Sequence, residues 1–251
     1  MTLFLKKHKK IILSTIFAVG IVVCLMLANC LSSFIMPINA SANSITANSF
    51  QMHLISLSKS QLENEAQSRA KDFQQMGAGG YVWKHDEYYH IISSAYLNKA
   101  DAELVQNSIK INQNLQTTLI TIKFNEYSIN GTFSNDENKV VSALMSACTS
   151  FYTSLYDVSI SLDTGVCNET SAKLLVNTAH HNFSTTLANF NTIFPSTPQA
   201  LKPLYEMTKS AYKIGEKLCQ TQLISQAQTY SSLLKYRYTE IMHLYYNFVN
   251  N

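Results

Sequence analysis

The sequence is short of charge. Only 14% of its 251 residues are Asp, Glu, Lys or Arg, against about 25% in an average soluble domain. We infer that part of the chain lies outside water. The basic excess is also local, because four lysines lie among the first ten residues and the rest of the chain carries 15 basic and 16 acidic side chains. This balance gives no reason to expect nucleic-acid binding through phosphates.

The common signatures of catalysis and metal binding are missing. The sequence has no HExxH, GxSxG, P-loop or GxGxxG motif and no CxxC pair, so it lacks the local patterns of several hydrolases, nucleotide-binding proteins and zinc sites. We therefore expect no enzymatic activity, no metal and no cofactor. A nucleophilic role for Cys167 stays open, because sequence does not show which histidine lies beside it in space.

One long run carries no charged side chain at all. Residues 11–36 read IILSTIFAVGIVVCLMLANCLSSFIM, and about 20 apolar residues suffice for a helix to cross a bilayer. Four lysines directly precede this run, so the positive-inside rule predicts a single-pass cell-membrane protein whose C-terminal region is extracytoplasmic. The alternative is a cleaved signal peptide, for which INASA at 38–42 offers a cleavage site. We expect residues 1–36 to form a basic tail and transmembrane helix, and residues 37–49 to form a linker.

Residues 50–124 alternate between strand and helix patterns. Strands are predicted at 50–57, 81–85, 88–96 and 115–124. Helices are predicted at 58–77 and from Asn98, a favourable N-cap. The order βαββαβ predicts an antiparallel, ferredoxin-like sheet with both helices on one face. The other face should then stay open to water or to a ligand.

The remainder of the chain has a helical pattern. After a polar linker at 125–138, apolar side chains recur at three- and four-residue spacing through residues 139–251, which predicts an α-helical bundle. Its last part is one long helix or two, because Gly215 interrupts the pattern. The predicted fold class is therefore α+β, with a transmembrane helix, a ferredoxin-like domain and a helical bundle.

The open face of the predicted sheet carries the candidate binding residues. Strand alternation sends Met52 and Leu54 towards the helix-covered core. Rings beside hydrogen-bonding side chains on an exposed sheet suit a sugar polymer, since rings cover C–H patches and polar groups meet hydroxyls. The alternative is that each is an ordinary strand residue. The candidate glycan-binding residues are Gln51, His53, Trp83, Tyr88, His90 and Ile92.

The same strands resemble a known family, the SPOR (sporulation-related) domain. The stretch YHIISSAYLNKADAE at 89–103 resembles the family's Tyr-Arg-Val-x-Val-Gly-Pro-Phe strand and the helix start after it. The residues at matching places are Tyr89, Ile91, Ser93 and Tyr96. The departures are His53 for a glutamine, Ile55 and Ser94 for glycines, and His90 for an arginine. The resemblance covers residues 50–124 and implies binding to peptidoglycan strands stripped of their stem peptides.

Two functions follow as expectations. The first is a non-catalytic, membrane-anchored protein that binds denuded peptidoglycan glycan at the division or sporulation septum. The alternative is an extracytoplasmic protein-interaction scaffold, with a degenerate SPOR domain and a helical region that recruits a protein partner. The aromatic run YSSLLKYRYTEIMHLYYNFVN at 230–250 supports the second function, because it carries more aromatic surface than one helix can bury alone.

Overall fold

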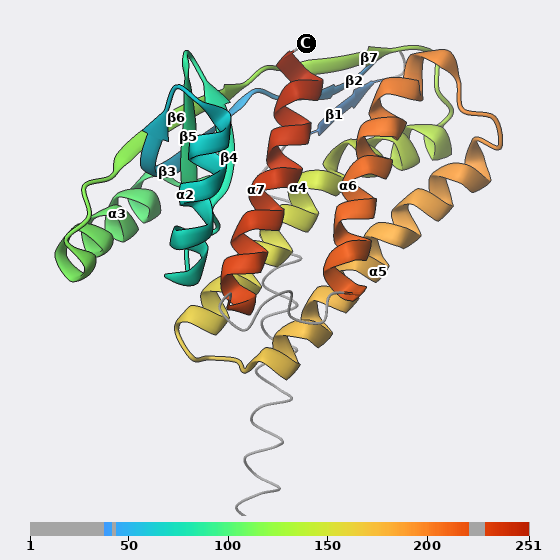
Figure 1. Cartoon of the computed structure of the whole chain (residues 1–251). Coiled ribbons are helices and arrows are strands. Elements are labelled where there is room, and N and C mark those ends of the chain that lie inside the picture. The colour runs from blue at the N-terminus through green and yellow to red at the C-terminus, as the bar shows by residue number, and fades with distance from the viewer. Residues whose placement is uncertain (1–37, 42–43, 221–228, 251) are drawn as a thin grey trace, which may run out of the picture. The chain divides into compact units, whose positions relative to one another are not determined.

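A ferredoxin-like unit occupies residues 50–124 of the computed structural model, which describes residues 38–41, 44–220 and 229–250 (Figure 1). Its elements are β3 (Phe50–Ser60), α2 (Glu63–Gln75), β4 (Tyr81–His85), β5 (Tyr88–Tyr96), α3 (Lys99–Gln113) and β6 (Thr118–Phe124). The strands pair antiparallel in the order β4-β5-β3-β6. Each helix therefore connects two strands that are separated in the sheet by a third strand, as in a split βαβ arrangement.

Local sequence sets the ends of these elements. The side chain of Asn98 accepts a hydrogen bond from the backbone N–H of Ala100 at 2.8 Å and caps α3, as the sequence predicts. Asn114 ends the same helix in a left-handed conformation with φ at 51°. Asp86, with φ at 53°, forms the tight turn between β4 and β5, which Asp tolerates better than most residues.

Two β-bulges distort the centre of the sheet. In the pairing of β3 with β5, the register skips Ser93 on β5 and Leu57 on β3. Each bulge adds one residue and shifts the side-chain alternation by one position. Strict alternation along either strand therefore assigns some side chains to the wrong face.

The helices α2 and α3 share one face of this sheet. Ala102 of α3 packs against Ile55, and Ala70 of α2 packs against Ile91. Across the two bulges, the pairing register places Ile55 and Ile91 on the same side. One face covered by both helices is therefore confirmed, but the prediction that Met52 and Leu54 point towards it is wrong. They share the side of Phe50, whose ring packs against Phe124 and Tyr245 on the opposite face.

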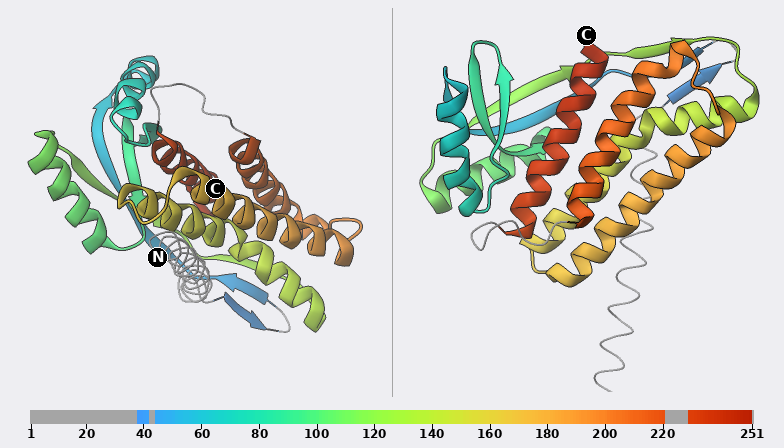
Figure 2. Two further views of the ribbon diagram at one scale, coloured as in Figure 1. Left: turned by 90° about the horizontal axis from the view of Figure 1, so that it is seen from below. Right: turned by 45° about the vertical axis from the view of Figure 1, so that its right-hand side comes forward.

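The opposite face is covered by α7 (Tyr230–Asn250), so the predicted open face is wrong. Tyr245 stacks against Phe124 with ring centroids 6.0 Å apart, and His243 stacks on Trp83 at 4.1 Å. The left view of Figure 2 shows α3 and α7 on opposite sides of the sheet. The physical reason is that α7 carries apolar and aromatic side chains around most of its circumference. It buries one side against the sheet and another against α4 and α6.

Both predicted linkers contain strands of a second sheet. The strands are β1 (Ile38–Ser41), β2 (Ser44–Ala47) and β7 (Tyr127–Asn130), paired antiparallel in the order β1-β2-β7. Ile45 and Ala47 alternate inwards and are buried with Ile129. The linker predictions at 37–49 and 125–138 are wrong in these parts, because two short polar segments far apart in sequence pair and bury their few apolar side chains.

The rest of the chain forms the predicted helices. These are α4 (Asn135–Asp163), α5 (Glu169–Ile193), a 3-10 turn (Gln199–Leu201), α6 (Lys202–Gln220) and α7. A capping box between Ser134 and Glu137 starts α4. Gly215 does not break α6: a Cβ atom there would lie 2.7 Å from the rings of His180 and Phe151, so the glycine permits close packing. The open question about the last run is settled as two helices, α6 and α7.

The sheet and the helices are not separate domains. From Ile38 onward the chain clusters into one compact unit. The segments predicted as domains, 50–124 and 139–251, share a core that is centred on the contacts of α7. Figure 1 shows α7 between the sheet and α6.

The membrane predictions need a correction. Within residues 38–41, 44–220 and 229–250, no helix has both the length and the apolar character that crossing a membrane requires. The apolar segment 11–36 lies outside these described residues. The predicted transmembrane helix and single-pass cell-membrane localisation are therefore not supported, and the described fold is α+β with six α-helices and two sheets.

Candidate binding site

The six predicted glycan-binding residues do not share a surface. Gln51 and His53 lie on the face that α3 covers, since His53 pairs with Tyr96 and shares its side of the sheet. His53 is only 6% exposed, and its Nδ1 lies 3.0 Å from the hydroxyl of Thr121. Burial, and then the charge of Lys99, lower the pKa of His53. This imidazole is therefore a neutral packing residue.

Trp83 and Ile92 lie beneath α7. Each is 1% exposed, and the hydroxyl of Tyr81 beside them lies 2.8 Å from Nδ1 of His243. Burial lowers the pKa of His243 to about 4 and raises the pKa of Tyr81, so both groups are neutral near pH 7. These rings belong to the interface between the sheet and α7, and no ligand can reach them without displacing that helix.

His90 and Tyr88 lie at the end of the β4–β5 hairpin. His90 is 8% exposed, with its Nδ1 3.1 Å from the hydroxyl of Ser56. Burial, followed by the neighbouring charge of His85, lowers the pKa of His90. Tyr88 is half-buried, and the ammonium of Lys59 lies 4.1 Å from its ring centroid. The prediction of one accessible platform is therefore wrong, and of the six residues only Gln51 is exposed.

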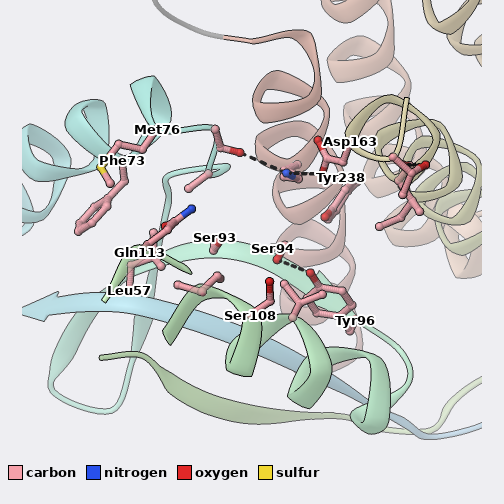
Figure 3. Close-up of a pocket in the computed structure, with 17 residues that line it drawn as sticks. Leu57, Phe73, Met76, Ser93, Ser94, Tyr96, Ser108, Gln113, Asp163 and Tyr238 are labelled. Carbon is pink, nitrogen blue, oxygen red and sulfur yellow. Dashed lines mark hydrogen bonds and ion pairs between the residues drawn. The ribbon is translucent and has the colours of Figure 1, made fainter. Parts of the chain in front are cut away.

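A cavity of about 520 Å³ lies where α2, α3, α4, α7 and the sheet meet (Figure 3). We call it the junction cavity. Both bulge residues, Leu57 and Ser93, line it. Its size falls within the range of about 300–1,000 Å³ that is typical of small-molecule sites. The distorted part of the sheet therefore forms part of the cavity wall.

One wall of the junction cavity carries a charged pair. The ammonium of Lys235 lies 2.7 Å from the carboxylate of Asp163 and donates a second hydrogen bond to the carbonyl of Gly77 at 3.2 Å. Lys235 is 15% exposed and Asp163 41%. Figure 3 shows these contacts joining α7 to the end of α4 and to the turn after α2. The pair leaves no unbalanced charge at the cavity.

Hydroxyl groups supply most of the remaining polarity. Ser94 donates a hydrogen bond to the Tyr96 hydroxyl at 2.8 Å, which leaves the Tyr96 proton free to be donated. Burial raises the pKa of Tyr96 to about 12, so this group is a donor over the physiological range. Among the described residues, the side chains of Ser93 and Gln113 have no hydrogen-bond partner. The hydroxyl-bearing residues of the lining are Ser93, Ser94, Tyr96, Ser108, Thr164 and Tyr238.

This arrangement suits binding better than catalysis. A nucleophile or general base needs an activating neighbour, and the Lys235 ammonium is instead neutralised by Asp163. Within the described part of the chain, no group of three or more His, Cys, Asp or Glu side chains is placed to hold a metal ion. Cys148, buried with its Sγ 3.3 Å from the sulfur of Met207, has its pKa raised to about 12 by burial and is therefore a protonated core thiol.

Sequence reasoning missed the residues that make this cavity. Asp163 comes from the end of α4, about 40 residues beyond the last strand of the sheet, and Lys235 and Tyr238 come from α7, more than 100 residues beyond it. The local signal that could have pointed to the site is the polar pair Ser93-Ser94 inside an otherwise apolar strand.

No protein-family model, curated protein or solved structure matches this chain.

Proposed function

We propose that this protein is a non-catalytic binding protein that holds a neutral, partly polar small ligand in the junction cavity. The observation that carries the proposal is the cavity lining. Nine of its 17 residues have polar side chains, whereas most small-molecule sites are predominantly apolar with few polar groups. A ligand that uses this lining carries several hydrogen-bonding groups on a compact apolar frame.

Neutrality of the ligand follows from the charged pair. A ligand carboxylate would compete with Asp163 for Lys235, and a cationic ligand would compete with Lys235 for Asp163. In the first case the ligand gains little, because Asp163 already neutralises Lys235. In the second case the Lys235 ammonium, which is only 15% exposed, would lose its partner, which is costly. A neutral ligand instead adds hydrogen bonds to Ser93, Tyr96 and Gln113 without breaking the pair.

A neutral amino sugar belongs to this ligand class. Its hydroxyl and amide groups match the polar lining, and its C–H face can pack against Phe73 and Leu57. The SPOR resemblance implies a glycan ligand, so we propose an N-acetyl sugar of the cell wall as the ligand in the junction cavity instead of on the sheet face. A role at the division or sporulation septum stays a prediction from that resemblance.

The test uses the full-length chain and the disaccharide of N-acetylglucosamine. Ser108 is an exposed residue of α3 at the rim of the cavity, so Ser108→Phe should fill the opening without disturbing the core. Asn107→Phe places the same ring one residue earlier, outside the lining. Calorimetric titration should detect binding to the wild type and to Asn107→Phe, and loss of binding in Ser108→Phe by at least about tenfold.

Two results would contradict the proposal. One is equal binding by Ser108→Phe and Asn107→Phe, which would place the ligand elsewhere. The other is the absence of binding for the disaccharide and for a fluorescent apolar dye alike, which would mean that the cavity takes no small molecule. If the dye binds, Ser108→Phe weakens its binding and the disaccharide does not bind, then the junction cavity is a small-molecule site but its ligand is not an amino sugar.

A further inference from the structure

A second hollow, of about 310 Å³, lies between α5 and α6 and shares no lining residue with the junction cavity. We call it the α5–α6 groove. Its α5 side is lined by Ser184, Leu187, Ala188 and Asn191, and its α6 side by Tyr205, Lys209, Tyr212, Lys213 and Glu216. The right view of Figure 2 shows the two helices side by side.

The tyrosine rings of this groove are held in place from α5. Tyr205 stacks on Phe190 with centroids 5.3 Å apart and an interplanar angle of 21°. Tyr212 stacks on His180 at 4.6 Å and 22°. Gly215 permits this close approach of α6 to His180. Because both rings are fixed before any ligand arrives, binding costs little ordering of the groove.

The charge of the groove is mainly positive. Lys209 and Lys213 lie one helical turn apart on the same face of α6, and neither makes an ion pair with the described residues. The ammonium of Lys209 lies 5.7 Å from the ring centroid of Tyr205. Glu216 is the one acidic residue of the lining, and it lies further along α6, nearly a turn beyond Lys213. Ser184 and Asn191 offer hydrogen-bond donors from the opposite wall.

We propose that the α5–α6 groove binds a small ligand with a phosphate or carboxylate group attached to a planar or aliphatic frame. The anionic group accepts hydrogen bonds from the two ammonium groups, and charge-assisted bonds of this kind are the strong ones. The frame lies against the rings of Tyr205 and Tyr212. The volume, near the lower limit for small-molecule sites, restricts the ligand to a single ring or a short chain. This site is independent of the function proposed for the junction cavity.

Phenyl phosphate, inorganic phosphate and benzoate are suitable probes for titration of the full-length chain, monitored by calorimetry. The double variant Lys209→Gln/Lys213→Gln should weaken the binding of phenyl phosphate by at least about tenfold. The double variant Lys110→Gln/Lys202→Gln removes the same charge outside the groove and should change binding by less than about twofold. Tyr212→Leu should weaken the binding of phenyl phosphate more than the binding of inorganic phosphate, because only phenyl phosphate has a ring that can lie against Tyr212.

The outcomes are distinct. Preference for phenyl phosphate over benzoate identifies a phosphate ester, and the reverse preference identifies a carboxylate. Equal weakening in the two lysine double variants would show a general charge effect and would overturn the site. So would the absence of binding for all three probes at about 10 mM, since such weak affinity is below that of a functional small-molecule site.

Discussion

The two faces of the four-stranded sheet are both covered, but they are packed differently. On one face, α2 and α3 present small side chains such as Ala66, Ala70 and Ala102, which bring each helix close to the strands and leave a cavity between the helices. On the other face, α7 presents large rings that fill the space against Trp83 and Phe124. Small side chains thus allow close approach with a void at the edge, and large ones give a filled interface.

The largest expected effect on stability comes from a substitution in the filled interface between the sheet and α7. Trp83→Ala removes the ring that stacks on His243 and should lower the free energy of unfolding by about 3–5 kcal/mol, measured by urea denaturation followed by circular dichroism. Tyr88→Ala, in the half-buried hairpin end, should cost about 1 kcal/mol or less. Similar losses in the two variants would contradict the difference in packing between them.

A smaller effect tests how closely α7 approaches the sheet. At Gly79 an added Cβ would lie 2.9 Å from the carbonyl oxygen of Ser93 and 3.0 Å from the backbone nitrogen of Tyr236. Because both neighbours are backbone atoms, Gly79→Ala should lower the midpoint of urea denaturation and cost about 1–3 kcal/mol. Gly131→Ala meets only the side chain of Phe133, which can rotate away. If the two variants proved equally stable, this tight approach would be refuted.

The pH dependence should distinguish the two faces as well. Burial lowers the folded-state pKa of His243 to about 4, whereas the unfolded value is near 6.5, so the unfolded chain binds the proton more tightly. Neutral His243 therefore contributes fully to the free energy of unfolding above pH 6.5, and this contribution is lost as the pH falls towards 4. Because the side chain is partly exposed, we expect the loss to be roughly 1–2 kcal/mol. His243→Phe should flatten the stability profile in this window relative to the wild type. An unchanged slope would mean that His243 does not titrate there, since His53, His90 and His180 remain in both proteins.

The smallest expected effect on stability comes from a substitution that partly fills the junction cavity on the other face. Val105 lines the junction cavity from α3, so Val105→Leu should add contacts there and raise the free energy of unfolding by about 0.5–1 kcal/mol. Ala95→Val enlarges a side chain on the α7 face, where Ala95 is fully buried, and should instead destabilise. Thermal melts should show a higher melting temperature than the wild type for Val105→Leu and a lower one for Ala95→Val. A loss of stability in Val105→Leu would indicate that the cavity cannot accept a larger side chain.

The sequence predicts local structure well and the partners of each surface poorly. The alternation in FQMHLISL and the N-cap at Asn98 lead directly to β3 and α3, because those signals lie within a few residues of the structure they specify. The bulges at Leu57 and Ser93 arise from pairing between strands, so neither strand shows them alone. For the same reason the hairpin at 38–47 reads as a linker, since its pairing strand is β7, about 80 residues later.

The candidate site was missed for a related reason. Trp83 and Ile92 have the composition of a binding surface, but which helix covers them depends on α7, at the far end of the chain. The aromatic run of α7 is compatible with a protein partner and with the core of a helical bundle, and the structure buries Tyr238 and Tyr245 within the chain itself. Excess aromatic surface on a helix indicates that something covers it, and here the covering element is the protein's own sheet.

The position of α7, more than 100 residues after the last strand of the sheet, affects the order of synthesis. A ribosome releases the four strands of the sheet long before it completes α7, so the side of the sheet that carries Trp83 and Phe124 is bare during most of translation. Asn250, at the tail of α7, hydrogen bonds to the carbonyl of Lys123 and to the N–H of Asn125. The nascent chain therefore exposes an apolar β surface to chaperones until α7 emerges.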